Sequence, residues 1–231
     1  FSAGESPAMA LDTVERYVRA TGPTHSEIQS EMADYADRNG FPIIGPDAGA
    51  VLRLLARLTD AERVFEFGSG YGYSASWFLA GGADEVVLTE IDEDELDMAR
   101  TFLERSGDAD RAQFEHGDAL EVVDDYDGPF DVVLIDHDKP RYDQGFDKAR
   151  EKVPEGGVVV ADNMTRGPID LDALTAYFAD GEALPEDASD GTEGIANYVE
   201  HVRADPAFES FVLPVGSGLC VSTRVAPRSD G

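Results

Sequence analysis

Two aspartates and an asparagine end two apolar runs of this chain, and their side-chain oxygens are ligands that hard metal ions prefer. Asp136 ends the run FDVVLID at 130–136, and Asp162 ends the run GVVVAD at 157–162, with Asn163 directly after it. Both runs are β-branched and continuous, as strands buried on both faces of a sheet are. In a doubly wound sheet the carboxyl ends of neighbouring parallel strands line one crevice. These three residues are therefore predicted to bind Mg²⁺ or another divalent cation, with water completing the shell.

Lys139 follows Asp136 by three residues and is predicted to be the proton acceptor of the site. The chain has only three lysines, at 139, 148 and 152, and it retains one of them beside the predicted cation. A nearby divalent cation disfavours the ammonium form of lysine and makes the amine a better general base. Two alternatives stay open. Lys139 neutralises carboxylates such as Asp138, or the two strand-end aspartates only cap the helices that follow.

A glycine-rich turn, VFEFGSGYGYS at 64–74, is predicted to hold a nucleotide-like cofactor. Gly68, Gly70 and Gly72 stand where a strand turns into a helix, and glycine there lets the backbone approach a ligand closely. The dinucleotide fingerprint GxGxxG would need its third glycine at Tyr73, whereas this turn reads ExGxGxG. The alternative is a tight strand-to-helix connection that binds nothing.

Glu90 ends the next strand, 22 positions after Gly68. A carboxylate at this place can accept two hydrogen bonds from a ribose diol. Asp92 can cap the helix that follows, which leaves Glu90 free for a ligand. Asp118 and Ala119 follow the third strand, where an adenine ring would lie. The alternative for Asp118 is the N-cap of a short helix.

The elements that must position these residues alternate between strand and helix over most of the chain. Strands are expected at 63–67, 85–90, 113–116, 130–136, 157–162, 209–214 and 218–224. Helices are expected at 7–20, 25–39, 47–58, 73–81, 93–106, 142–151, 169–179 and 194–204, with a polar loop at 180–193. The alternation predicts an α/β fold with a Rossmann-like, seven-stranded, mostly parallel sheet and helices on both faces. The short connection at 216–218 predicts an antiparallel C-terminal hairpin at the sheet edge.

The composition predicts a single domain over residues 1–231, with a helical part to about residue 58 and a cofactor-binding core from 59 onward. The chain has 48 acidic and 18 basic residues, and a net charge of −30 would repel nucleic acid. Acid-rich, lysine-poor surfaces are typical of halophilic proteins, and an ordinary acidic protein is the alternative.

Targeting signals and cysteine chemistry are both limited in this chain. No apolar run approaches the roughly 20 residues of a membrane helix. The opening FSAGESPAM is too polar for a secretory signal, so we expect a cytoplasmic protein without a membrane partner.

The single cysteine, Cys220, excludes an internal disulfide and a cysteine-based zinc site, and it is expected to be a buried thiol in a late strand.

Together these residues resemble the catechol O-methyltransferase and caffeoyl-CoA O-methyltransferase family over about residues 27–224. The resemblance rests on IIGPDAG at 43–49, the glycine turn, Glu90, the DHDK segment and the ADN segment. It implies a class I enzyme that uses S-adenosylmethionine (SAM) and acts on a small-molecule acceptor. Relatives include monomers and dimers, so a homodimer is one expected state.

The resemblance also assigns roles to matching positions. The implied cofactor-binding residues are Ile44, Glu66, Gly68, Gly70, Gly72, Ser74, Glu90, Ile91, Asp118, Ala119 and Asp136. Asp136, Asp162 and Asn163 match the metal ligands, and Lys139 matches the general base. The chain departs from the catechol enzyme at Asp138, where that enzyme has an aromatic wall residue, and at Gly70, where it has tyrosine. These departures predict a more open and polar acceptor pocket.

The expected reaction is therefore metal-dependent transfer of a methyl group from SAM to a hydroxyl of a small, vicinal-diol aromatic molecule. Two other functions stay as alternatives. One is an NAD-dependent oxidoreductase, against which the missing third glycine argues. The other is a non-catalytic protein that binds SAM, against which the complete set of predicted ligands and Lys139 argues. For His137, core packing and cofactor contact are both compatible with the sequence.

Overall fold

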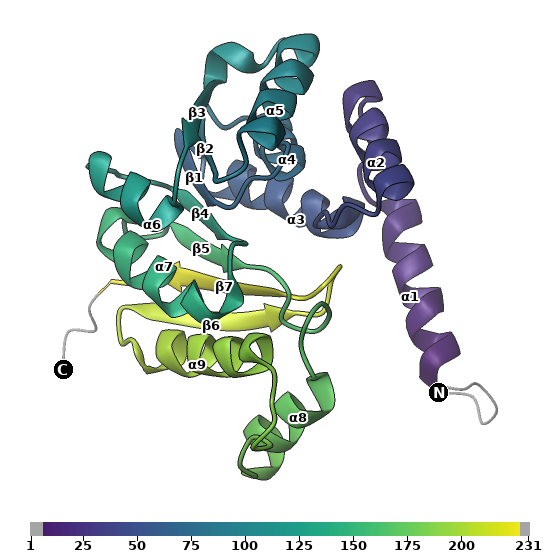
Figure 1. Cartoon of the computed structure of the whole chain (residues 1–231), viewed down its shortest axis with the longest axis vertical. Helices are drawn as coiled ribbons and strands as arrows, with labels where there is room; N and C mark the ends of the chain where they lie inside the picture. The colour runs from purple at the N-terminus through teal and green to yellow at the C-terminus, as the bar shows by residue number, and fades with distance from the viewer. Residues whose placement is uncertain (1–6, 227–231) are drawn as a thin grey trace.

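A seven-stranded sheet forms the centre of the molecule in a computed structural model that describes the backbone of residues 7–226 and the side chains from residue 13 (Figure 1). The strands are β1 (Arg63–Phe67), β2 (Glu85–Glu90), β3 (Ala112–His116), β4 (Val132–Ile135), β5 (Val158–Ala161), β6 (Phe208–Leu213) and β7 (Leu219–Arg224). Their order is β3-β2-β1-β4-β5-β7-β6. The first five strands pair in parallel, while β7 pairs antiparallel with both β5 and β6. The predicted sheet and its reversed C-terminal hairpin are confirmed.

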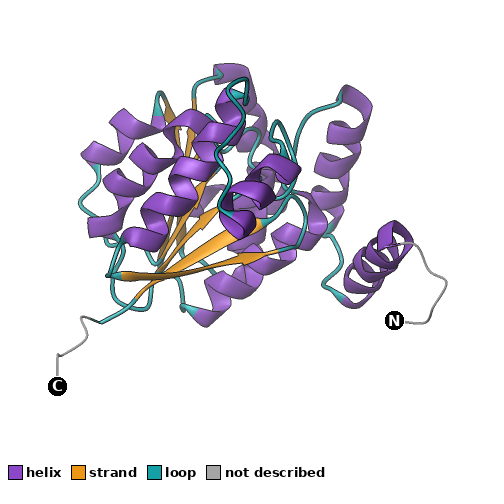
Figure 2. Ribbon diagram, turned by 90° about the horizontal axis from the view of Figure 1, so that it is seen from below, coloured by secondary structure: helices purple, strands orange, loops and turns teal. Residues whose placement is uncertain are grey.

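Helices cover both faces of this sheet (Figure 2). They are α1 (Pro7–Thr21), α2 (Glu27–Asn39), α3 (Gly45–Leu58), α4 (Tyr73–Gly81), α5 (Glu93–Ser106), α6 (Ala119–Val122), α7 (Tyr142–Ala149), α8 (Leu171–Thr175) and α9 (Asp190–Ala204). Successive strand residues point to opposite faces. Val64 and Val132 therefore join the core beneath α2 to α5, whereas Phe65 and Val133 join the core beneath α6, α7 and α9. Cys220 is buried in β7, as predicted.

Several predicted boundaries were wrong. The predicted helix 169–179 is α-helical only at Leu171–Thr175 and continues to Asp180 as a wider turn. The start of α9 also differs. This helix begins at Asp190, four residues before the predicted start, because the Ser189 hydroxyl caps it by accepting from the Thr192 N–H. The predicted loop at 180–193 is correspondingly shorter. Polar residues and a glycine fill this first turn, so it lacks the apolar periodicity on which the prediction depended. The predicted helix 142–151 ends at Ala149 and continues as a single tighter turn.

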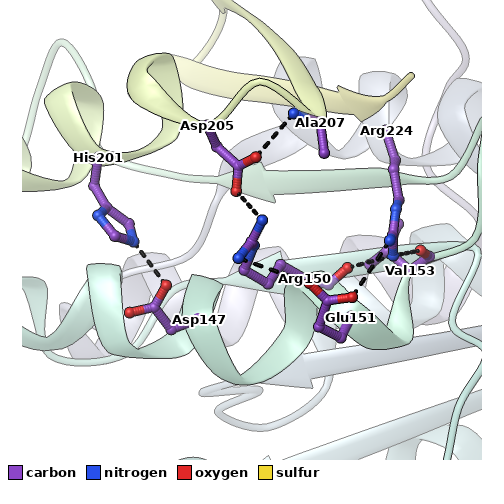
Figure 3. A network of polar contacts seen from close by, with 8 residues as sticks. All are labelled: Asp147, Arg150, Glu151, Val153, His201, Asp205, Ala207 and Arg224. Carbon is purple, nitrogen blue, oxygen red and sulfur yellow. Dashed lines mark hydrogen bonds and ion pairs between the residues drawn. The ribbon is translucent and has the colours of Figure 1, made fainter. Parts of the chain in front are cut away.

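A polar network connects α7, α9 and β7 on the face of the sheet that is covered by α6, α7 and α9 (Figure 3). His201 of α9 bonds Asp147 of α7 at 2.7 Å, and Arg150 bonds Asp205 at 2.6 Å. Arg224 of β7 donates to two backbone carbonyls between α7 and β5, at 2.7 and 2.8 Å. The His201–Asp147 pair is exposed, and such pairs contribute only about 0.2–1 kcal/mol, whereas Asp205 is largely buried in its pair with Arg150. The network therefore serves mainly to fix where α9 lies, and α9 supports part of the site. Over residues 7–226, no helix is both long and apolar enough to cross a lipid bilayer.

Candidate active site

A cavity of about 730 Å³ opens at the carboxyl ends of β1, β2, β4 and β5. Strand order reverses between β1 and β4, and such switch points are where doubly wound sheets bind ligands. The predicted site residues that line this cavity are Ile44, Gly68, Gly70, Ser74, Glu90, Ile91, Asp118, Ala119, Asp136, Lys139, Asp162 and Asn163. Glu66 and Gly72 lie behind the wall instead. One cavity thus brings together most of the predicted cofactor residues, the predicted metal ligands and the predicted base.

The glycine turn is shaped by close backbone contacts as well as by the cavity. Gly68 has φ +81°, and a side-chain carbon there would lie 2.7 Å from the carbonyl oxygen of Asp136. Gly72 has φ +83°, and a side-chain carbon there would lie 3.0 Å from Ala99 of α5. At Gly70 the space that a side chain would enter faces the ring of Phe41, 3.2 Å away. Packing therefore requires glycine at position 68, and the positive φ angles at 70 and 72 also favour glycine, with Phe41 taking part of the space beside Gly70.

Glu90 is held by the backbone of the turn that it faces. Its Oε2 accepts from the Gly70 N–H at 2.9 Å, and its Oε1 accepts from Ile91 and Asp92 N–H groups at 2.8 and 3.1 Å. Asp92 caps α5 as predicted. Three backbone N–H groups therefore orient the Glu90 carboxylate, which the sequence did not predict. A carboxylate has about four acceptor sites, so Glu90 keeps capacity for a ligand donor.

Glu66 is a fully buried carboxylate behind Ser74, a residue that lines the cavity. Neither carboxylate oxygen has a regular hydrogen-bond partner among the described residues. Burial raises the pKa of Glu66 to about 8, and Ser74 opposes this shift only in part. An acidic group that the protein buries without a partner suits a ligand ammonium, such as that of SAM. The residues present therefore fit this cofactor.

Asp136 and Asp162 directly follow the paired ends of β4 and β5, so the register of these two strands brings the aspartates side by side. Asp136 Oδ1 accepts from the Tyr142 hydroxyl at 3.2 Å and from Lys139 Nζ at 3.4 Å. Asp162 is 2% exposed, and its Oδ1 has no hydrogen-bond partner among residues 13–226. Burial, followed by repulsion from Asp136, raises the pKa of Asp162 to about 8. A cation would relieve that repulsion.

The predicted metal ligands Asp136, Asp162 and Asn163 offer a metal side-chain oxygen donors. The described residues contain no group of three or more His, Cys, Asp or Glu side chains suited to a metal. The predicted set differs from such a group because it has two carboxylates and the amide of Asn163, which adopts the left-handed conformation at φ +64°. Two carboxylate oxygens, an amide oxygen and water are ligands that Mg²⁺ accepts. The residues fit a divalent cation, and the metal itself stays a prediction.

Lys139 pairs with the predicted metal ligand rather than with its neighbour. Its Nζ lies 3.4 Å from Asp136 Oδ1 and 3.4 Å from the carbonyl oxygen of His137. The alternative partner, Asp138, has no hydrogen bond to Lys139 in the described structure. The His137 ring stacks on Tyr142 with ring centres 5.4 Å apart, and burial lowers the pKa of His137 to about 4. His137 is therefore a neutral packing residue at neutral pH that also reaches the cavity wall.

Asp118 is the N-cap that the sequence offered as an alternative, and its contact with an adenine ring stays a prediction. It caps α6 by accepting from the Leu120 N–H, and it lines the cavity, where it also pairs with Arg141 at 2.8 Å. Ile91 is 73% exposed at the cavity mouth.

Sequence reasoning missed other cavity residues, including Phe41, Tyr73, Glu95 and Arg141. It also missed Tyr142, which contacts Asp136. Arg141 and Tyr142 close the DHDKPRY segment, which was the available signal for them, whereas nothing local marks Phe41 as a wall of the site.

This strand order, a cavity at the switch point and an acid at the end of β2 define a Rossmann-like protein with a site for a nucleotide-like cofactor. The chain belongs to the O-methyltransferase family, whose sequence model matches residues 25–225. A catechol O-methyltransferase from Niastella koreensis is 28% identical over 183 residues, which cover 75% of this chain and 77% of that protein. A caffeoyl-CoA O-methyltransferase from Eucalyptus gunnii is 24% identical and covers 96% of this chain and 91% of its own length.

Solved structures agree with this family. An O-methyltransferase from Bacillus cereus in complex with SAH superposes with a TM-score of 0.76 at 25% identity, covering 92% of this chain and 97% of its own. The O-methyltransferase TomG from Streptomyces achromogenes, solved with SAM, shares the fold with a TM-score of 0.79 at 23% identity, covering 96% of this chain and 100% of its own. The protein is a SAM-dependent O-methyltransferase of the catechol and caffeoyl-CoA type. The NAD-dependent and non-catalytic alternatives are thereby set aside.

Proposed function

We propose that this enzyme methylates one hydroxyl of a small, vicinal-diol aromatic acceptor and that the reaction depends on Mg²⁺ or another divalent cation. The observation that carries the proposal is the convergence of Asp136, Asp162, Asn163 and Lys139 in one cavity. Two adjacent acceptor oxygens suit such a site, because one cation can bind both.

In this proposal different residues bind the cation, accept the proton and position the acceptor. Asp136, Asp162 and Asn163 would hold the cation, which when bound lowers the pKa of an acceptor hydroxyl. Lys139, as the neutral amine that a nearby divalent cation favours, would take the proton of that hydroxyl. The cavity walls hold the resulting oxyanion in line with the methyl group of SAM, and such positioning can account for several kcal/mol of the barrier.

Contacts with SAM are proposed on the other side of the cavity. Glu66 faces the ammonium of its methionine end, together with Gly68, Gly72, Ser74 and the backbone at Ile44. Glu90 accepts from the ribose hydroxyls, while Gly70, Ile91, Asp118 and Ala119 lie along the nucleoside. These contacts come from the segment before α3 and from the carboxyl ends of β1, β2 and β3, apart from the predicted metal ligands after β4 and β5, so we expect SAM to bind without metal.

The acceptor is proposed to be neutral or cationic rather than a polyphosphate ester. Of the residues that line the cavity, the lysine and arginine are Lys139 and Arg141, and each is already paired with a carboxylate. A net charge of −30 adds long-range repulsion of anions. The name of the Niastella koreensis relative supports a catechol-like acceptor over a CoA thioester. A homodimer, a cytoplasmic location and adaptation to high salt stay predictions of the sequence.

The proposal is tested by screening vicinal diphenols, their monophenol counterparts and a CoA thioester with labelled SAM, with EDTA or with added Mg²⁺. We expect turnover of the diphenols only, its loss in EDTA and its recovery with Mg²⁺. Lys139→Ala should slow single-turnover methylation by about 10²–10⁴-fold while SAM still binds. Lys148→Ala is the matched control, because Lys148 is a surface lysine paired with Asp124 outside the cavity. Full activity in EDTA would refute the metal, and equal rates for Lys139→Ala and Lys148→Ala would refute the base.

A further inference from the structure

We propose that Tyr142 is a positioning residue that orients the Asp136 carboxylate toward a cation and holds the Lys139 side chain beside it. The inference rests on the proposed function, since it concerns the same metal site. Tyr142 is the first residue of α7 and is 0% exposed. It does not line the cavity, so it acts only through the two residues that do.

Tyr142 touches both of these functional groups through different parts of its side chain. Its hydroxyl donates to Asp136 Oδ1 at 3.2 Å. Its ring faces Lys139, with Nζ 5.4 Å from the ring centre, which is within the range of a cation–π contact. A single side chain therefore sets the distance between the predicted ligand and the predicted base.

The Tyr142 ring is itself held from two sides. His137 stacks on it at 5.4 Å with an interplanar angle of 19°, and Tyr198 of α9 meets it edge-on at 5.7 Å and 82°. The network in Figure 3 fixes α7 against α9 and so keeps Tyr198 in place. A ring confined in this way presents its hydroxyl in one direction.

The hydroxyl and the Lys139 ammonium donate to the same oxygen of Asp136. Within residues 13–226, no hydrogen bond engages the other oxygen, Oδ2. The carboxylate is thus held by one oxygen and keeps the second for a ligand. Partners that orient a metal ligand in this way typically change metal affinity by about 10–100-fold when they are removed.

The competing explanation is that Tyr142 only fills the core. Three substitutions separate the two explanations. Tyr142→Phe keeps the ring and removes only the hydroxyl, whereas Tyr142→Leu removes both contacts. Tyr198→Phe is the matched control, since Tyr198 is an equally buried tyrosine in contact with the same ring and has no bond to Asp136 or Lys139.

The experiment measures Mn²⁺ binding to the full chain by electron paramagnetic resonance in molar KCl, without acceptor. The acidic surface will also bind Mn²⁺, so Asp162→Ala supplies the baseline that is subtracted. We expect Tyr142→Phe to weaken the site by about tenfold and Tyr142→Leu by at least as much. Tyr198→Phe should bind Mn²⁺ as the parent does. SAM affinity, measured by calorimetry, should stay unchanged in Tyr142→Phe and Tyr198→Phe.

Two outcomes would overturn the inference, and they differ from failure of the proposed function. Parent-like Mn²⁺ affinity in Tyr142→Phe, or an equal loss in Tyr198→Phe, would reduce Tyr142 to a packing residue while the metal site stands. If the parent binds no more Mn²⁺ than Asp162→Ala, the metal site itself is absent, and the inference falls together with the proposed function.

Discussion

Glu66 and Asp162 are acids that the ligand-free fold buries with little compensation from the protein. Burial raises both pKa values to about 8. An ionised carboxyl group in such a place is destabilising unless a ligand cation approaches it. Each residue is thus suited to a positive partner, an ammonium for Glu66 and a metal for Asp162.

The first prediction at this scale concerns the pH dependence of stability. An unfolded glutamate titrates near pH 4.3, so between about pH 5 and 8 the folded Glu66 holds a proton that the unfolded chain has lost. Stability therefore falls as pH rises through this window. Glu66→Gln should reduce that fall by a few kcal/mol, because each pKa unit corresponds to about 1.4 kcal/mol. Urea unfolding without SAM measures it, and the exposed Glu62→Gln should change nothing. Identical pH profiles for the parent and Glu66→Gln would contradict the raised pKa.

The second prediction concerns Glu90. Glu90→Ala should weaken SAM binding by about 1.5–3 kcal/mol, the value typical of hydrogen bonds to a charged group. The loss has two sources, since the substitution removes the proposed ribose acceptor and also releases the Gly70 N–H from its partner. Calorimetry gives the affinity, with Glu93→Ala, an exposed acid at the start of α5, as the control. Unchanged SAM affinity in Glu90→Ala would remove Glu90 from the cofactor site.

At the scale of elements, α9 supports the turn that carries Lys139. A side-chain carbon at Gly194 of α9 would lie 2.5 Å from the Lys139 carbonyl oxygen and 2.8 Å from the Pro140 nitrogen. Only glycine allows the turn at 139–141 to approach the helix this closely. The early start of α9 at Asp190 places Gly194 inside the helix rather than at its beginning.

Gly194→Ala is therefore predicted to push the turn off α9 and displace Lys139. Turnover should fall clearly while SAM affinity stays the same, because the proposed SAM contacts lie before α3 and after β1, β2 and β3, away from α9. Overpacking of this kind typically costs about 1–3 kcal/mol of stability. Asn197→Ala, an exposed substitution in the same helix, is the control for both rate and melting temperature. Normal turnover by a folded Gly194→Ala enzyme would show that the position of the turn does not matter.

At the scale of the whole molecule, the most prominent property is the surplus of negative charge. The net charge is −30, and the acidic residues are spread through the sequence. Several of the few basic residues are paired with a carboxylate of the same molecule, including Arg150 with Asp205 and Arg141 with Asp118. Most carboxylates therefore repel one another across the surface, and salt screens such repulsion strongly at molar concentration.

The melting temperature should consequently be clearly higher in molar KCl than in dilute buffer. Sucrose at equal osmolality separates screening of charge from general exclusion of cosolvent, and it should raise the melting temperature much less. Differential scanning calorimetry without ligand provides the measurement. A melting temperature that is insensitive to KCl would remove the halophilic interpretation and leave an ordinary acidic protein.

The sequence by itself determined the sheet and the main elements of the site. Buried β-branched runs, glycines at a strand-to-helix turn and acids at strand ends are local patterns, and the parallel topology then brings those strand ends to one edge. For this reason Glu90, Asp136, Asp162 and Lys139 could all be assigned to one cavity from their positions alone. The start of α9 was missed because its first turn is polar.

Only the tertiary structure decided which groups are paired. Lys139 contacts Asp136 rather than Asp138, Glu90 is held by three backbone N–H groups, and Phe41 reaches the glycine turn from a segment far away in the sequence. These outcomes depend on which segments pack against one another. Burial likewise depends on the whole fold, and it raises the pKa of Glu66 although its position in the sequence marks it only as a strand residue. Local patterns place a side chain on a strand or a turn, but long-range packing determines its partner and its charge.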